Sequence, residues 1–168
     1  MKCCVKYLSL VLFLLVWLCK VRAQSADSSR YFFLKAVDEK SNRLFQTAYN
    51  DFMHSLEYDS LNGDALREAG LTAVELRKYE NAIVEFEKLV KVRKNDTTAV
   101  NQLATLYFWT HRWEKAVKYA SLANQLHTGS NNNYILGKSY YEMEDYGHAF
   151  SFLPAAANED PENAEIPY

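Results

Sequence analysis

The sequence predicts an all-α protein built from about four helical hairpins arranged one after another. Blocks that start at Ser29, Gly63, Thr97 and Ser130 are 34, 34, 33 and 34 residues long, and a period of this length is typical of stacked helix pairs. Small residues recur at two fixed positions of every block. The chain also has only 5 Gly and 3 Pro among 168 residues, which disfavours a turn-rich β protein.

An export signal is predicted at the N-terminus, over residues 1–23. Lys2 and Lys6 precede the apolar run 8–18, and small residues just before Gln24 fit a cleavage site. The run is shorter than the roughly 20 apolar residues that a membrane-spanning helix needs. We therefore expect cleavage and an exported protein, periplasmic, envelope-associated or secreted, with a retained membrane anchor as the alternative.

All three cysteines, Cys3, Cys4 and Cys19, lie within the predicted signal. The rest of the chain therefore has no thiol for a disulfide, a nucleophile or a metal ligand. Four of the 19 basic residues and none of the 21 acidic residues lie in the signal, so the remainder is mildly acidic. An acidic body argues against nucleic acid as a partner.

The remaining chain divides into a tether and a repeat array. Residues 24–28 are polar and lack apolar periodicity, so we expect a flexible tether. The array covers 29–163, with repeats at 29–62, 63–96, 97–129 and 130–163, and 164–168 reads as the start of an incomplete further repeat. A terminal repeat without a polar cap exposes an apolar face, which predicts self-association as one possibility.

Four positions carry the repeat pattern. The eighth and twentieth positions hold only Ala or Gly, which suits a close crossing of two helices because a larger side chain would push them apart. The seventeenth is aromatic in every block and is expected to begin the second helix. The residues at positions 8, 17, 20 and 24, block by block, are Ala36, Phe45, Ala48, Phe52; Gly70, Tyr79, Ala82, Phe86; Ala104, Trp113, Ala116, Ala120; and Gly137, Tyr146, Ala149, Leu153.

This pattern resembles the tetratricopeptide repeat, over essentially residues 29–168. The resemblance implies a right-handed superhelical solenoid, of the kind found in exported bacterial proteins. The first repeat departs from it, with Lys35 at a usual leucine position and Glu39 at a usual aromatic position. Pro154, inside the second helix of the fourth repeat, is expected to kink or shorten that helix.

The resemblance also implies where a partner would bind, because the first helices of such repeats line a concave groove. Aromatic and Arg side chains are common interface anchors, and several groove positions here are aromatic beyond what the core needs. The predicted groove residues are Phe33, Arg67, Asn101, Phe108, Trp109, Asn131, Tyr134, Lys138 and Tyr141.

No residue pattern predicts catalysis. The histidines fall at unrelated repeat positions, and no metal-binding, phosphate-binding or nucleophile motif is present. We therefore expect a non-enzymatic protein without metal or cofactor that binds a protein or peptide partner as a scaffold. Two alternatives stay open: a glycan-binding envelope protein, and the repeat region of a longer enzyme.

Overall fold

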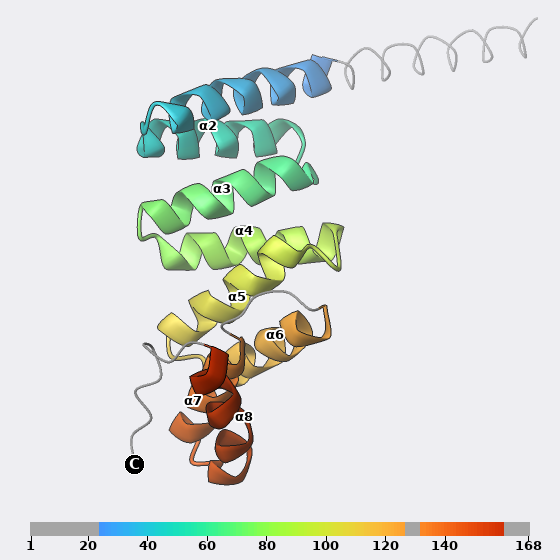
Figure 1. Cartoon of the computed structure of the whole chain (residues 1–168). Helices are drawn as coiled ribbons and strands as arrows, with labels where there is room; N and C mark the ends of the chain where they lie inside the picture. Colours follow the sequence, from blue (N-terminus) through green and yellow to red (C-terminus); the bar gives the residue numbers. More distant parts are fainter. Residues whose placement is uncertain (1–23, 127–131, 160–168) are drawn as a thin grey trace, which may run out of the picture. The chain divides into compact units, whose positions relative to one another are not determined.

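The computed structural model describes residues 24–126 and 132–159, and within these residues the chain forms helices and turns without strands (Figure 1). A first helical segment covers 24–41. It is followed by α2 (Phe45–Tyr58), α3 (Gly63–Glu75), α4 (Tyr79–Val92), α5 (Thr97–Trp109), α6 (Trp113–Gln125), α7 (Asn132–Glu142) and α8 (Tyr146–Glu159). The predicted all-α repeat fold is confirmed. The chain forms two compact units, residues 1–65 and 66–168, which divide within α3.

Each hairpin turns in the same way. The second helices begin at Phe45, Tyr79, Trp113 and Tyr146, the predicted aromatic position. Two residues earlier the backbone is left-handed, with φ of 60°, 56°, 56° and 62° at Arg43, Arg77, His111 and Glu144. The residue after each of these four donates its N–H to the carbonyl oxygen five residues earlier, at 2.8–2.9 Å. This hydrogen bond ends the first helix in a Schellman turn. The four hairpins therefore share one turn geometry.

Small residues lie where the paired helices cross, as the sequence predicts. A Cβ added at Gly70 would lie 2.8 Å from Cε1 of Phe86, and one added at Gly137 would lie 2.7 Å from Cδ2 of Leu153. Ala104 of the third repeat is fully buried. The eighth position of a repeat is therefore small because the side chain at the twenty-fourth position fills the space above it.

The expected flexible tether at 24–28 is wrong, because the chain is already helical from residue 24. Two serines fasten this polar segment to the end of α2. The Ser25 hydroxyl donates to the carbonyl of Tyr58 at 2.8 Å, and the buried Ser29 hydroxyl donates to the carbonyl of Ser55 at 3.0 Å. Hydroxyl-to-carbonyl contacts hold the segment without an apolar face, so hydrophobic periodicity did not reveal it.

Two departures from the repeat pattern, Lys35 and Pro154, can be followed in the structure. The Lys35 ammonium lies 2.6 Å from the carboxylate of buried Asp51, so an ion pair stands where leucine is usual. Of the two effects expected of Pro154, a kink or a shorter helix, the shorter helix is wrong, because α8 runs through Glu159 and has 14 residues, like α2 and α4. Pro154 and Phe150 are both exposed, so water can reach the Phe150 carbonyl that proline leaves without a donor. Residues 164–168 lie outside the described residues.

Candidate partner-binding surface

Most of the predicted groove residues lie on two neighbouring first helices of the second unit. Helix α5 carries Asn101, Phe108 and Trp109, and α7 carries Tyr134, Lys138 and Tyr141. Helices α5 and α7 contact each other directly. We call these six residues the α5–α7 surface. Asn131 lies outside the described residues.

Phe108 joins the two helices. Its ring meets the Tyr134 ring edge to face at 5.8 Å between centroids and meets Trp113, at the start of α6, at 5.7 Å. Phe108, Tyr134 and Asn101 are all half-buried. Phe108 thus packs against the neighbouring repeat and still presents part of its ring.

Trp109 is the most exposed aromatic residue of this surface, with 50% of its area accessible. Its ring lies 5.6 Å from that of Tyr79, the first residue of α4 in the preceding repeat. Trp109 is therefore held by a ring contact while half of its area stays accessible. Sequence analysis identified Tyr79 only as a packing residue. The signal that could have linked Tyr79 to this surface was its spacing to Trp109, the aromatic residue at the end of the next first helix.

The α7 part of the surface combines an aromatic ring with a cation. The Lys138 ammonium lies 5.0 Å from the centre of the Tyr141 ring and 3.4 Å from a carboxylate oxygen of Glu142. The Tyr141 ring in turn contacts Tyr146 at 5.6 Å. Because Glu142 already balances Lys138, this part of the surface offers stacking area more than free positive charge.

Arg67 forms an ion pair within the protein. Its guanidinium pairs with the carboxylate of Asp96, which also caps α5 by accepting the Ala99 N–H at 3.0 Å. Burial alone would raise the pKa of Asp96, but the hydrogen bonds from Arg67 and Ala99 outweigh it and the pKa is lowered. Arg67 therefore positions the start of α5, and its charge is already compensated.

Phe33 belongs to the first unit. It is half-buried, with its ring 5.8 Å from that of Phe52 in α2. The ring therefore packs within its own hairpin. Beside it in the same helical segment, Val37 is 40% exposed.

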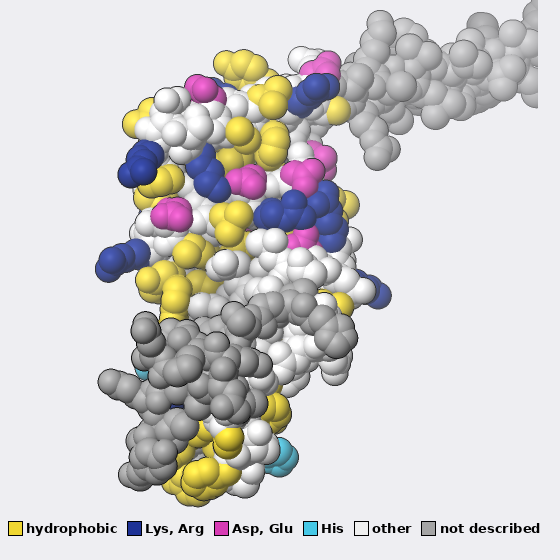
Figure 2. Space-filling model, in the orientation of Figure 1, with side chains coloured by type: hydrophobic (Ala, Val, Ile, Leu, Met, Phe, Trp, Pro, Cys, Tyr) yellow, Lys and Arg dark blue, Asp and Glu magenta, His cyan; other side chains and the backbone are white. Residues whose placement is uncertain are grey.

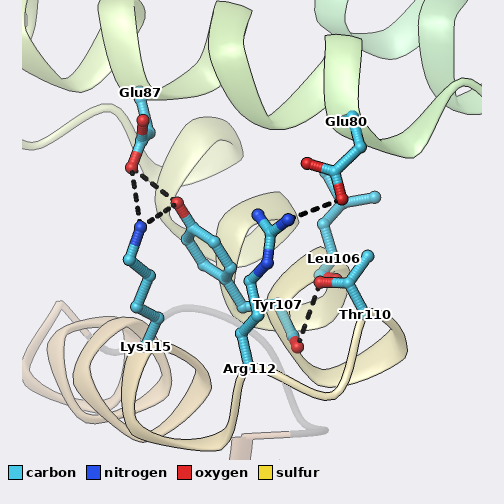
Figure 3. Close-up of polar contacts among 7 residues, drawn as sticks. All are labelled: Glu80, Glu87, Leu106, Tyr107, Thr110, Arg112 and Lys115. Carbon is cyan, nitrogen blue, oxygen red and sulfur yellow. Dashed lines mark hydrogen bonds and ion pairs between the residues drawn. The ribbon is translucent and has the colours of Figure 1, made fainter.

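A cluster of polar side chains around the buried Tyr107 holds α5 in place, and sequence analysis missed it as a functional feature (Figure 3). The hydroxyl of the fully buried Tyr107 donates to Glu87 of α4 at 2.5 Å and lies 3.3 Å from the ammonium of Lys115 in α6. Nearby, Arg112 donates to Glu80 at 2.7 Å. Tyr107 immediately precedes Phe108 and Trp109 in the chain, so the cluster fixes the helix that presents them.

The cluster also shifts two pKa values. The hydrogen bond from Tyr107 lowers the pKa of Glu87, with Lys115 acting in the same direction. Burial raises the pKa of Tyr107, and the Glu87 charge adds to that rise. The pair is therefore held as a neutral phenol that donates to an ionised carboxylate, and the pKa shifts have a structural origin.

Two features are absent from the described part of the chain. Within residues 24–126 and 132–159, no three or more His, Asp or Glu side chains are grouped so that they could hold a metal ion. Over the same ranges, no helix is long and apolar enough to cross a membrane.

The hairpins, their shared turns and their small crossing residues define a tetratricopeptide-repeat protein. The sequence profile of the family described as "Anaphase-promoting complex, cyclosome, subunit 3" matches residues 75–165, more than half of the chain, and the protein belongs to this family. No curated protein matches it as a whole sequence.

Solved structures of other repeat proteins share the fold. A MamA fragment from Desulfovibrio magneticus RS-1 matches with a TM-score of 0.71 and 17% identity, covering 82% of this chain and 78% of that one. YrrB, described as a TPR protein with an unusual peptide-binding site, matches with a TM-score of 0.71 and 19% identity, covering 83% and 72%. PilF of Pseudomonas aeruginosa matches with a TM-score of 0.63 and 17% identity, covering 80% and 62%.

Proposed function

We propose that this protein is a scaffold that binds a peptide or protein segment on the α5–α7 surface. The observation that carries the proposal is Trp109, which is half-exposed, supported by Tyr79 on one side and continuous along α5 with the Phe108–Tyr134 contact. Rigid aromatic side chains bury much area at little entropic cost, and they often dominate binding energy.

The way the surface is held favours binding. Tyr107, Glu87 and Lys115 fix α5 between α4 and α6, so the aromatic rings are placed before a partner arrives. A pre-formed surface loses less entropy on association than a mobile one.

A scaffold role also agrees with the family and fold of the chain. The family name printed for the matching profile is that of a subunit of a complex, and YrrB is described as having a peptide-binding site. These descriptions belong to those proteins. They make a peptide or protein the first class of ligand to test here.

The test is to select binding peptides from a displayed random library and to measure their affinity by fluorescence anisotropy. Trp109→Ala should weaken binding by about 2 kcal/mol, roughly thirtyfold, as expected for an interface anchor. Val84→Ala is the matched control, because Val84 is 47% exposed but lies on the second helix α4. Peptides that bind equally to both variants would exclude the α5–α7 surface as their site.

We also propose that the protein acts outside the cytoplasm, in the cell envelope. The charged N-terminus, the short apolar run and the small residues before Gln24 support this. N-terminal sequencing of the protein recovered from its own cells should begin at Gln24. Recovery of the chain from the cytoplasm with residues 1–23 intact would contradict export.

A further inference from the structure

The aromatic part of the α5–α7 surface recurs from one repeat to the next. Phe108 and Tyr141 both hold the twelfth position of their repeats. The Phe108 ring meets Trp113, the first residue of α6, edge to face at 5.7 Å between centroids. The Tyr141 ring meets Tyr146, the first residue of α8, in the same way at 5.6 Å. Two neighbouring first helices therefore carry the same pair of rings.

Trp109 extends this row of rings toward the preceding repeat. Its ring contacts Tyr79 at the start of α4, and half of its area is accessible. Hydrophobic side chains gather in the region where Figure 1 draws the start of α4 and the end of α5 (Figure 2). The row of rings thus runs across the repeats.

The polar groups of this surface are hydrogen-bond donors without a partner. Within residues 24–126 and 132–159, no hydrogen bond engages the indole N–H of Trp109 or the hydroxyls of Tyr134 and Tyr141, and neither hydroxyl is buried. The Lys138 ammonium is balanced by Glu142 at 3.4 Å. The surface therefore offers ring faces and donors with no net charge.

We propose that the segment bound on the α5–α7 surface is rich in proline and adopts the polyproline II conformation, a proposal that rests on the scaffold function given above. Such a segment has no internal hydrogen bonds, so its carbonyl groups are free to accept from Trp109, Tyr134 and Tyr141. Its pyrrolidine rings are apolar and suit aromatic faces, which is how aromatic-lined surfaces bind proline-rich peptides.

The spacing of the rings fits this ligand. A polyproline II helix rises about 3.1 Å per residue with three residues per turn, so one turn advances about 9 Å. Helices that pack directly lie about 8–10 Å apart, and α5 and α7 contact each other directly. Successive turns of the ligand would therefore meet equivalent rings, Phe108 on α5 and Tyr141 on α7.

Other classes of peptide fit the surface less well. An α-helix pairs its own carbonyl groups, so its apolar face would leave the three donors without acceptors. An extended strand binds by pairing with a sheet edge, and the described residues form no strand. An acidic segment needs an uncompensated cation, whereas Lys138 is already paired with Glu142.

The experiment measures binding of a fluorescent, capped oligoproline about nine residues long, three turns of the helix, to the full chain by fluorescence anisotropy. A capped glycine–serine peptide of equal length should not bind. Trp109→Phe and Tyr141→Phe keep a ring but remove a donor, and each should weaken oligoproline binding about fivefold. High salt should leave the affinity unchanged, because the surface has no net charge to screen.

Tyr58→Phe is the matched control. Tyr58 is 46% exposed and lies at the end of α2, outside the α5–α7 surface, so removing its hydroxyl should not change the affinity. Circular dichroism should show the same helix content in all three variants.

The proposal would be overturned if oligoproline does not bind, if the glycine–serine peptide binds as well, or if the two surface variants bind like Tyr58→Phe. Proline-free peptides from the displayed library that Trp109→Ala weakens would overturn the ligand class and leave the scaffold function intact. If neither oligoproline nor any library peptide depends on Trp109, both proposals fail.

Discussion

The junction between the second and third repeats differs from the junction between the third and fourth. The first is joined mainly by polar contacts, Tyr107 to Glu87 and Arg112 to Glu80, beside the ring contact of Tyr79 with Trp109. The second is joined by aromatic rings, Phe108 on Tyr134, and by an amide contact of 3.1 Å between Asn124 and Asn133.

The two kinds of contact have different consequences: one holds a helix rigidly, and the other leaves area that a partner can bind. Directional hydrogen bonds to a fully buried phenol fix the position of α5 on α4, and they leave little area for a ligand. Half-buried aromatic rings hold α5 and α7 together while part of their area stays exposed. The polar junction therefore positions α5 and supports Trp109, and the aromatic junction adds the Phe108–Tyr134 part of the surface.

The largest expected effect comes from breaking the polar junction. Tyr107→Ala should lower the free energy of unfolding by about 4 kcal/mol, because it removes a fully buried aromatic ring. Tyr107→Phe keeps the ring and should cost only about 1 kcal/mol, since Glu87 retains Lys115 nearby at 3.7 Å. Urea unfolding followed by circular dichroism measures both, and equal losses would show that the ring contributes little.

Breaking the aromatic junction should cost less. Phe108→Ala is expected to lower the free energy of unfolding by about 2 kcal/mol, because the ring is only half-buried. The same variant should lose affinity for any peptide selected on the α5–α7 surface. Full binding by a folded Phe108→Ala protein would separate the aromatic junction from recognition.

A pH titration tests how much the Arg67–Asp96 ion pair contributes to stability. The folded pKa of Asp96 lies below its ordinary value of 3.8, so the Arg67–Asp96 contribution is fully present above about pH 4 and is lost as pH falls through the folded pKa. Asp96→Asn keeps an oxygen that can cap α5 but removes the charge. It should cost about 1 kcal/mol at neutral pH and flatten the stability loss in acid. An unchanged acid profile would assign that loss to other carboxylates.

The smallest effect is expected at the exposed ion pair. Arg112→Gln should lower the free energy of unfolding by about 0.5 kcal/mol, because Arg112 and Glu80 are both accessible to water. High salt should remove the difference between the variant and the original chain. A loss that salt leaves unchanged would assign the effect to the contact of Arg112 with the Tyr107 ring.

The fold could be predicted from the sequence because the repeat constrains it. Gly70 and Gly137 marked the helix crossings, and the aromatic seventeenth position marked each second helix. The tether at 24–28 was mispredicted because serine-to-carbonyl hydrogen bonds leave no periodic signal.

The candidate site was less predictable for a physical reason. Repeat positions place Arg67 and Trp109 on first helices, but they do not say which side chain is already paired. Asp96, 29 residues further along the chain, pairs with Arg67, whereas half of the Trp109 side-chain area stays accessible. Three-dimensional contacts alone distinguish the two.

The most direct test of the account is site-specific photocrosslinking in the cells that produce the protein. A photoreactive phenylalanine analogue would replace Trp109 on α5 or, in a separate variant, Val84 on α4. The account predicts a discrete crosslinked partner from position 109 and none from position 84. Equal crosslinking at both positions, or a discrete partner from position 84 alone, would contradict the assignment of recognition to the α5–α7 surface.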